Sequence, residues 1–512
     1  MRRLFNFFMI LSALSVAACS ACTKEKNSSN NGGDDETGDT FEVEYYEFSP
    51  RLPESTRYAV KVAGEYIKVF PTYEPHLAWF GAEGGTVKVE VSLQGEKISK
   101  AVVRPLGKNY KYELKNNKIT LELQKYDRVS VEVNDDIENP LFIFVNPIDS
   151  EKPSKNDPSV MYFEAGQIYD LAKAPYNYNG GSLVLTPGCK EIYLEPGTYV
   201  KGNILGVDID GVKIHGGGFI DASGYPGRYA KEFYQPYGIA FCRCPNSEFS
   251  DFTNLFADGG WSSLYTNCHH SNITNVKTLG LNSEPGKKTN NDSMDIIGGI
   301  DVHVSKCFMR GHDDVYCLKS QKFKLKGDDV DGIYYEDCIG WNIDAGNTFE
   351  IGYETQLNIR NVHYKDIYSI HSGTSDTDYK RAAISIHNGA AGTISDVSYT
   401  NAYLEDVQEF ALYLACLNHD YNIGFDDDGN ELEYSPGKIQ NVTYRNINVL
   451  NVRPGKGYCV IQGYDGEHQV SDVDFYSFNY LGREVGSLND GIWSVRRNCS
   501  DVRFNSINSD NN

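Results

Sequence analysis

Two short acidic stretches carry residue types suited to acid–base chemistry: residues 290–292 (Asn-Asn-Asp) and residues 311–314 (Gly-His-Asp-Asp). Carboxyl groups crowded into one patch cannot all ionise freely, so at least one is expected to hold its proton near neutral pH. A protonated carboxyl beside ionised neighbours can protonate a leaving oxygen while the neighbours activate water, which is the chemistry of glycoside hydrolysis. Each stretch alone is also typical of a solenoid turn, so the hypothesis depends on whether the fold brings the two together.

A loose internal repeat supplies elements that would do so. Its unit has five positions: the first is Val or Ile, the third is aromatic or polar, the fifth is usually Asp or Asn, and the second and fourth vary. The copies begin at Val302, Ile333, Val362, Val397 and Val442, which are 31, 29, 35 and 45 residues apart. Further short strands are expected at residues 294–296, 316–318, 349–351, 383–386 and 412–414. Strands at such irregular periods, without helical stretches, predict a right-handed parallel β-helix rather than a β-propeller.

Stacking of the coils turns this spacing into positions in space. The expected inward row consists of Ile296, Leu318 and Ile351. Counting back four residues from each puts Asp292, Asp314 and Asn347 in one outward column, with successive coils about 4.8 Å apart. Asp313 adjoins Asp314 at the same strand entry, so three carboxylates are expected in one patch.

The preceding part of the chain has a different rhythm. Residues 86–91, 118–123 and 129–133 alternate apolar and polar side chains, which predicts half-buried antiparallel strands, and residues 141–145 read as a more deeply buried strand. With 48 Gly and 36 Tyr against 5 Met, the composition also favours strands over helices. We therefore predict an all-β chain with a β-sandwich domain at 41–155, followed by a parallel β-helix catalytic domain at 156–512.

The N-terminus has the features of an export signal. Residues 1–18 combine a basic pair with a short apolar run, and the Val-Ala-Ala-Cys that ends at Cys19 resembles a bacterial lipobox. It predicts a lipid at Cys19 that anchors the protein to a membrane, at the outer-membrane surface or in the periplasm of a Gram-negative bacterium; ordinary cleavage nearby is the alternative. Residues 19–40 are polar and acidic, which predicts a flexible linker.

Charge and cysteine usage exclude several classes of protein. The net charge of −22 argues against nucleic acid as a partner. The 12 cysteines form no pair of matched CxxC motifs, so a zinc site is not expected and buried thiols are the default interpretation. No metal or other cofactor is predicted. Whether Cys307 and Cys338 form a disulfide stays open, and no oligomeric state is predicted.

The motifs between Asn290 and Tyr353 resemble those of glycoside hydrolase families 28 (polygalacturonases) and 49 (dextranases and isopullulanase), which have the pectin-lyase-like β-helix. The likeness lies in Asn-x-Asp, then Asp-Asp one coil later, then Gly-x-x-hydrophobic-x-Ile-Gly. It implies that Asp313 is the general acid and that Asp292 and Asp314 activate the attacking water. The N-terminal sandwich and Lys319 look more like family 49.

The chain also departs from the polygalacturonase pattern. Gly346-Asn347-Thr348 stands where polygalacturonases carry Gly-His-Gly, and residues 383–387 (Ala-Ile-Ser-Ile-His) stand in place of an Arg-Ile-Lys that grips the substrate carboxylate, with Arg381 just outside. Without those cations a uronate would bind an acidic site poorly, so a neutral glycan is expected.

Further residues around these motifs are candidates for contacts with a sugar. Aromatic rings could stack on sugar faces and polar groups could hydrogen-bond, although packing and surface charge explain such residues as well. The substrate-binding candidates are Asn291, His312, Lys319, Trp341, Asn347, Glu350, Tyr353 and His387.

The sequence thus predicts an inverting glycoside hydrolase for a neutral, dextran-like polysaccharide or oligosaccharide. Inversion follows if the acid and the base lie about 6.5–9.5 Å apart. The alternatives are a polygalacturonase-like pectin hydrolase, a polysaccharide lyase, and a non-catalytic glycan-binding β-helix, because a fold alone does not fix a function.

Overall fold

The computed structural model describes most of the chain after its N-terminal segment. The described residues are 41–225, 237–257, 259–284, 290–322, 325–373, 381–418 and 435–505. The predicted signal, Cys19 and the linker therefore lie outside the described residues. Thr40–Asn512 forms one compact unit. Over the described ranges, no helix has the length and apolar character needed to cross a membrane.

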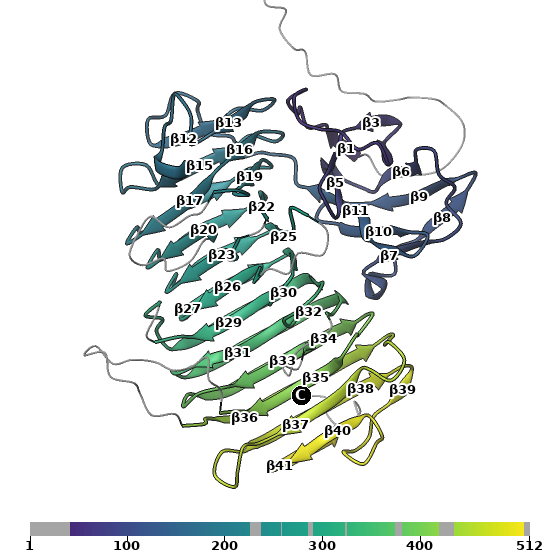
Figure 1. Ribbon diagram of the computed structural model, residues 1–512, viewed down its shortest axis with the longest axis vertical. Coiled ribbons are helices and arrows are strands. Elements are labelled where there is room, and N and C mark those ends of the chain that lie inside the picture. Colours follow the sequence, from purple (N-terminus) through teal and green to yellow (C-terminus); the bar gives the residue numbers. More distant parts are fainter. Residues whose placement is uncertain are drawn as a thin grey trace, which may run out of the picture. The chain divides into compact units, whose positions relative to one another are not determined.

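Two sheets form the N-terminal β-sandwich (Figure 1). The first has the order β1-β5-β11-β10-β7, with β4 on β5, and the second has the order β3-β2-β6-β9-β8. The first sheet contains β1 (Phe41–Glu44), β4 (Val69–Pro71), β5 (His76–Gly84), β7 (Ala101–Arg104), β10 (Arg128–Val133) and β11 (Asp136–Asn146). The second contains β2 (Tyr58–Val62), β3 (Glu65–Ile67), β6 (Val87–Leu93), β8 (Tyr112–Lys115) and β9 (Lys118–Leu123). One pairing differs from the antiparallel prediction, because β5 and β11 run parallel.

The rest of the chain winds into a parallel β-helix (Figure 1). An 11-stranded sheet forms one side: β14 (Ser182–Val184), β17 (Asn203–Val207), β20 (Tyr237–Cys242), β23 (Trp261–Thr266), β26 (Met294–Ile297), β29 (Tyr316–Ser320), β31 (Phe349–Thr355), β33 (Ala382–Asn388), β35 (Phe410–Cys416), β37 (Tyr458–Gln462) and β40 (Trp493–Arg497). All its pairings are parallel, and all five predicted short strands lie in it.

A 19-stranded sheet forms the remaining sides. Its first part contains β12 (Val160–Phe163), β13 (Ile168–Asp170), β15 (Glu191–Leu194), β16 (Tyr199–Lys201), β18 (Lys213–His215), β19 (Phe219–Asp221), β21 (Glu248–Ser250), β22 (Thr253–Ala257), β24 (Asn272–Thr274) and β25 (Lys277–Leu281). Its second part contains β27 (Gly299–Ser305), β28 (Phe308–Gly311), β30 (Val330–Asn342), β32 (Ile359–His371), β34 (Thr393–Leu404), β36 (Lys438–Val449), β38 (Val470–Tyr480), β39 (Arg483–Glu484) and β41 (Cys499–Asn505). Two 3₁₀ turns, Leu106–Lys108 and Asn179–Gly181, complete the described elements.

The sequence repeat corresponds to the bend in the long strands. Its terminal Asp or Asn takes the left-handed conformation, with φ between 51° and 56°, at Asp337, Asp366, Asn401 and Asn446. Asn and Asp tolerate this conformation better than other residues with a side chain, because their short polar groups can hydrogen-bond locally. These residues therefore let one strand continue from one side of the coil to the next.

The aromatic position of the repeat forms a ladder inside the solenoid. The rings of Tyr335, Tyr364, Tyr399 and Tyr444 are buried and stack on one another, with centroids 4.6 to 5.1 Å apart and planes within 5°. The predicted inward row of Ile and Leu side chains is also buried, since the register pairs Ile296 with Leu318 and Leu318 with Ile351. These two ladders hold successive coils in register.

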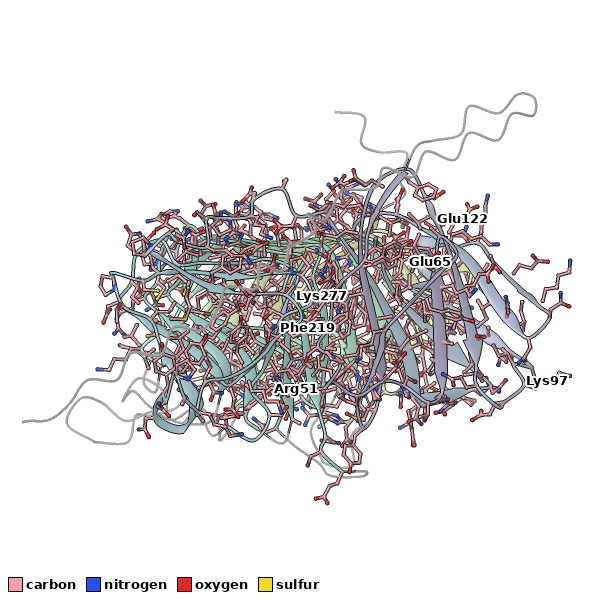
Figure 2. The ribbon with its side chains drawn as sticks, turned by 90° about the horizontal axis from the view of Figure 1, so that it is seen from above. Arg51, Glu65, Lys97, Glu122, Phe219 and Lys277 are labelled. Carbon is pink, nitrogen blue, oxygen red and sulfur yellow. The ribbon has the colours of Figure 1, made fainter. Side chains whose placement is uncertain are left out.

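The polar face of β10 is buried where the sandwich meets the solenoid, so the prediction of a half-buried strand at 129–133 is wrong for this strand. Arg128 Nη2 lies 2.6 Å from Asp337 Oδ2, and Glu132 Oε1 lies 2.8 Å from His371 Nε2. Apolar contacts surround these ion pairs, and Phe219 and Lys277 (Figure 2) belong to the same region. Buried charges need partners, and here each element supplies them to the other.

The cysteines of the described ranges are all free thiols, and most of them are buried. Cys307 and Cys338 follow this pattern and form no disulfide. Burial raises the pKa of Cys338 well above its ordinary value, as expected for a thiol that packs as a small apolar side chain.

A pair of Ile→Ala variants tests the inward row. Ile351→Ala removes a fully buried side chain and should lower the free energy of unfolding by about 2–5 kcal/mol, because it leaves a cavity between coils. The control Ile300→Ala removes a side chain that is 42% exposed and should change it by no more than about 0.5 kcal/mol. Denaturant unfolding measures both, and equal losses would contradict the assignment of the row.

Candidate active site

Strand register aligns the acidic stretches on consecutive coils. Met294 pairs with Tyr316, and Tyr316 pairs with Phe349, so the residues two positions earlier, Asp292, Asp314 and Asn347, lie level with one another. Backbone hydrogen bonds continue the ladder into these turns, from Ser293 N to Asp314 O (2.9 Å) and from Val315 N to Asn347 O (2.9 Å). The predicted column is therefore present at the entry to β26, β29 and β31.

Asn347 orients Asp314. Its backbone N–H and side-chain amide nitrogen both donate to Asp314 Oδ1, at 2.7 and 3.0 Å, while its side-chain Oδ1 accepts from Ala382 N at 2.9 Å. Asn347 is fully buried, so the prediction that it contacts substrate is corrected. It holds a carboxylate in place from the next coil.

Asp313 is half-buried beside Asp314. The Asn290 amide nitrogen donates to Asp313 Oδ2 at 2.8 Å, while the amide oxygen accepts from Trp261 Nε1 at 3.0 Å. Burial, and next the charge of Asp314, raise the pKa of Asp313 to about 7, although Arg381 acts in the opposite direction. This carboxyl can therefore hold or release a proton near neutral pH.

Arg381 belongs to the site, which corrects its placement just outside. The register pairs Tyr316 with Phe349 and Phe349 with Ile384, so the residues three positions earlier are Asp313, Gly346 and Arg381. Gly346 has φ +85°, and a Cβ there would lie 2.2 Å from the Asp313 carbonyl carbon. In this column no side chain stands between Asp313 and Arg381, because the residue between them is Gly346. The Asp column is predicted by counting back four residues from the inward row. Counting back five residues and continuing to the next coil, from Ile386, would have predicted Arg381 in the column of Asp313.

Lys319 neutralises the carboxylates behind Asp313 rather than facing a sugar. Its ammonium lies 3.0 Å from Asp295 Oδ1 and 3.4 Å from Asp292 Oδ2, and 3.9 Å from the centroid of the Trp261 ring. Burial would lower the pKa of Lys319, but the negative charges around it, that of Asp295 first and among the others those of Glu354 and Asp292, together outweigh burial and raise it. With its side chain only 4% exposed, Lys319 is a buried counter-ion, and its predicted substrate contact is corrected.

Asp292, Asp295 and Cys317 place one ligand atom each within 4.8 Å of one another, a spacing that could hold a metal ion. The residues do not fit one well. Lys319 already supplies positive charge to both carboxylates, and burial raises the pKa of Cys317, which keeps it a thiol that donates to Gly352 O at 3.3 Å. Burial also raises the pKa of Asp292 well above its ordinary value, with repulsion from Asp295 as the next cause.

Glu350 and His387 form a second polar group on the same side of the solenoid. Glu350 points outward as predicted but is fully buried; it accepts from Ser385 Oγ and lies 3.0 Å from His387 Nδ1. Burial raises the pKa of Glu350 well above its ordinary value and lowers that of His387 to about 3, so the two are hydrogen-bonded as neutral groups. His387 Nε2 has no partner among the described residues, and Tyr353 stacks on its ring at 4.4 Å. Because the Glu350 carboxylate is fully buried and bonded to Ser385 and His387, its predicted substrate contact is corrected, whereas substrate contacts by His387 and Tyr353 stay predictions.

Three further predicted contacts are corrected by burial. The Asn291 amide is held inside the fold: its nitrogen donates to Phe256 O and Leu281 O, and its oxygen accepts from Ser262 Oγ. Trp341 packs on Phe142 of the sandwich, with centroids 5.4 Å apart. His312 is buried and donates from Nε2 to Glu74.

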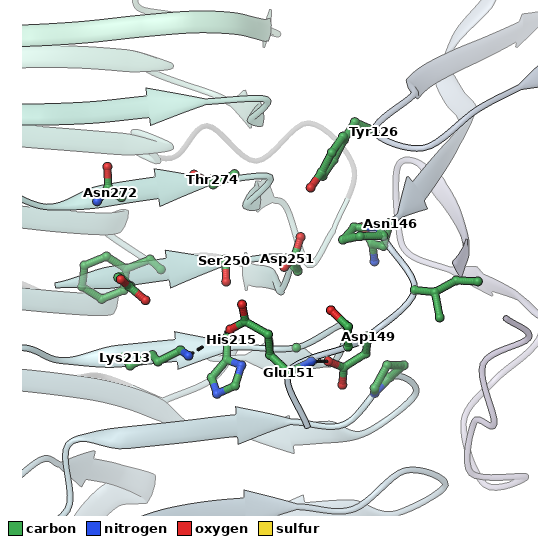
Figure 3. Close-up of a pocket in the computed structure, with 18 of the residues that line it drawn as sticks. Tyr126, Asn146, Asp149, Glu151, Lys213, His215, Ser250, Asp251, Asn272 and Thr274 are labelled. Carbon is green, nitrogen blue, oxygen red and sulfur yellow. Dashed lines mark hydrogen bonds and ion pairs between the residues drawn. The ribbon is translucent and has the colours of Figure 1, made fainter. Parts of the chain in front are cut away.

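A cavity of about 400 Å³ lies elsewhere, between the linker that follows β11 and the outer face of β18, β21 and β24 (Figure 3). Its charged groups are largely paired: Lys213 lies 3.1 Å from Glu151, and His215 lies 3.0 Å from Glu191. No residue of the Asp column lines it. The cavity is therefore not where the acid–base groups converge.

No family model and no curated protein sequence matches the chain. Among solved structures, it is similar to Dex49A from Penicillium minioluteum, with 13% identity, a TM-score of 0.49, and coverage of 88% of this chain and 97% of that one. It is also similar to a family 28 exopolygalacturonase from Yersinia enterocolitica, with 10% identity, a TM-score of 0.39, and coverage of 81% and 96%. A third similar structure is an endo-xylogalacturonan hydrolase from Aspergillus tubingensis, with 14% identity, a TM-score of 0.38, and coverage of 68% of this chain and 93% of that one. Likeness at this level concerns the fold alone, and function depends on the chemistry of the site.

Removing the buried ammonium should destabilise the protein. Lys319→Met leaves Asp292 and Asp295 buried without their cation, and we expect a loss of about 3–5 kcal/mol in the free energy of unfolding. The loss should be larger at pH 8 than at pH 5, because the two carboxyls can neutralise themselves by protonation at the lower pH. Urea unfolding measures it. The control Lys365→Met removes an exposed partner of Glu336 and should leave the midpoint nearly unchanged; equal midpoints for both variants would contradict the buried counter-ion.

Proposed function

We propose that the chain is an inverting glycoside hydrolase that cleaves a neutral polysaccharide or oligosaccharide. Asp313 acts as the general acid, and Asp292 and Asp314 position and activate the attacking water. The observation that carries the proposal is Asp313 itself, a half-buried carboxyl with a pKa of about 7 beside Asp314, which Asn347 orients. A group with this pKa can protonate a leaving oxygen at neutral pH, which glycoside cleavage requires.

The balance of charge supports a neutral sugar. Around the Asp column the described residues include five carboxyl groups in addition to Asp313, and two cations, Lys319 and Arg381. The carboxyl groups are Asp292, Asp295, Asp314, Glu350 and Glu354. Lys319 is committed to Asp292 and Asp295, and the charge of Arg381 acts first on Asp313 and Asp314. A uronate would thus meet an excess of negative charge.

Three rival functions make different demands on the same residues. A polygalacturonase-like enzyme would use Arg381 as a partner for the substrate carboxylate. A polysaccharide lyase needs a basic group beside a uronate, and it leaves an unsaturated product. A non-catalytic glycan-binding protein needs no acid at all, so its glycan affinity would survive the loss of the Asp313 proton.

Replacing the acid separates these possibilities. Asp313→Asn should reduce turnover of neutral glycans (dextran, pullulan, galactans) by about 10²–10⁴-fold, because proton donation to the leaving group is lost. Reducing-end release measures turnover, and proton NMR of the first product gives the anomeric configuration, expected to be inverted. The control Asp331→Asn changes an acid that pairs with Arg360 on the surface and should keep full activity.

Other outcomes on the same panel favour the rivals. Cleavage of polygalacturonate alone would overturn the neutral substrate, and an unsaturated, ultraviolet-absorbing product would indicate a lyase. Glycan affinity with no turnover in the wild type, unchanged in Asp313→Asn, would indicate a binding protein.

The pH dependence of turnover should follow the same group. Because the acid must carry its proton, kcat should fall as pH rises through about 7, by about tenfold per unit well above it. After burial, the charges of Asp314, Arg381 and Lys319 have the largest effects on the pKa of Asp313, and therefore on the pH at which kcat falls. Initial rates at saturating substrate between pH 5 and pH 9 measure this pH dependence. The control Asp331→Asn should have the same pH profile as the wild type. A rate that is flat between pH 6 and pH 9 would contradict the assignment of the acid.

Export and acylation at Cys19 are part of this proposal. A lipid-anchored hydrolase at the cell envelope would meet polysaccharides too large to enter the cell. The support is the lipobox-like sequence that ends at Cys19.

A further inference from the structure

Glu74 reaches from the sandwich to the turn that carries Asp313. It lies between β4 and β5, where Thr72 braces the turn: Thr72 Oγ1 donates to Pro75 O at 2.7 Å, and Glu74 N donates to Thr72 Oγ1 at 3.1 Å. The Glu74 carboxylate then accepts from Arg310 Nη1 and His312 Nε2, each at 3.1 Å, and from Asn282 N at 3.0 Å.

These partners directly precede the paired carboxylates. Arg310 lies in β28, and His312 follows the end of that strand, immediately before Asp313. Both side chains are buried, so each needs a fixed partner, and Arg310 Nη1 also donates to Gly280 O at 2.8 Å. The sandwich thus supplies the carboxylate, that of Glu74, to which the two buried side chains on this side of the turn are bonded.

The next coil fixes the other side of the turn through its backbone. Ile343 N donates to Gly311 O at 3.0 Å, Ala345 N donates to His312 O at 2.9 Å, and Asn342 Nδ2 donates to Asp313 O at 2.6 Å. The turn is therefore held on one side by bonds from the next coil to its backbone and on the other by the bonds of Glu74 to Arg310 and His312. Charged hydrogen bonds of this kind are short and directional, which suits positioning.

We propose that Glu74 is a positioning residue for Asp313 and Asp314, so that the sandwich domain completes the active site of the solenoid. The inference rests on the proposed function. Glu74 acts through Arg310 and His312: it balances the guanidinium of Arg310, three residues before Asp313, and it fixes the imidazole of His312, the residue directly before Asp313. Glycoside hydrolysis then depends on an element that contributes no reacting group.

Glu74→Gln keeps the shape of the side chain and removes its charge. With the Arg310 charge uncompensated, Asp313 should lose its proton at lower pH, and the alkaline limb of kcat should move down by about one pH unit. We expect kcat at pH 7 to fall by about fivefold, as a one-unit shift from pH 7 implies, with KM within about twofold, and Glu74→Ala to lose about tenfold more. The matched control is Glu132→Gln, which removes a buried sandwich carboxylate bonded to His371, two coils further along from Arg310.

The control separates positioning from docking of the sandwich. Both Glu→Gln variants should lower the melting temperature, but Glu74→Gln alone should shift the pH profile. Equal profiles for wild type and Glu74→Gln, or equal shifts in both variants, would overturn the inference while leaving the proposed function standing.

A second measurement needs no substrate. Hydrogen–deuterium exchange of the backbone amides at 311–316 should be faster in Glu74→Gln than in the wild type and unchanged in Glu132→Gln. Unchanged exchange at this turn in Glu74→Gln would overturn the inference even if no glycan were turned over, whereas absence of turnover in the wild type would count against the proposed function alone.

Discussion

The register of the parallel coils is the constraint on which the candidate site depends. A slip of one residue in a strand would turn every side chain to the opposite face, so that Ile296, Leu318 and Ile351 would leave the interior and the acidic column would be scattered. The aromatic ladder of Tyr335, Tyr364 and the rings beyond them resists such a slip, because each ring stacks on the next at 4.6 to 5.1 Å. Packing inside the solenoid therefore fixes chemistry on its outside.

A second constraint comes from charges buried between the sandwich and the solenoid. Arg128, Glu132 and Glu74 each find their partner on the other element, at 2.6 to 3.1 Å. An unpartnered buried charge is far more destabilising than a paired one, so the two elements cannot separate without exposing or orphaning these groups. The sandwich is consequently not a loosely appended module, and its β4–β5 turn ends beside the turn that carries the acid.

The same principle explains how a crowded acidic site can exist. Asp292 and Asp295 are buried with their pKa values raised, and Lys319 limits the repulsion between them. Asp313 has Arg381 in its own column, two coils on, and the charge of Arg381 opposes the rise in the pKa of Asp313. Asp295 and Asp313, whose pKa values are raised to about 7, are thus held close to the balance between their two protonation states, which is the condition that proton transfer near neutral pH requires.

Features that depend on local periodicity could be predicted from the order of the residues alone. The two strand rhythms, the inward row and the column of Asp292, Asp314 and Asn347 all follow from counting along the chain, because parallel coils repeat the same local geometry. The order of the residues also indicated the acid–base chemistry, since crowded carboxyls shift one another's protonation wherever they meet.

Which of the neighbouring residues are available to a substrate became visible only in the folded chain. Asn291, His312, Lys319 and Trp341 read as plausible sugar contacts, yet each is buried against a protein partner. Glu74 and His312 are 238 residues apart in the chain, and no local sequence pattern predicts a contact between them. Periodicity predicts which residues stack within the solenoid. Which residues pack against the solenoid depends on the shape and charge of two surfaces whose residues lie far apart in the sequence, with no fixed spacing between them.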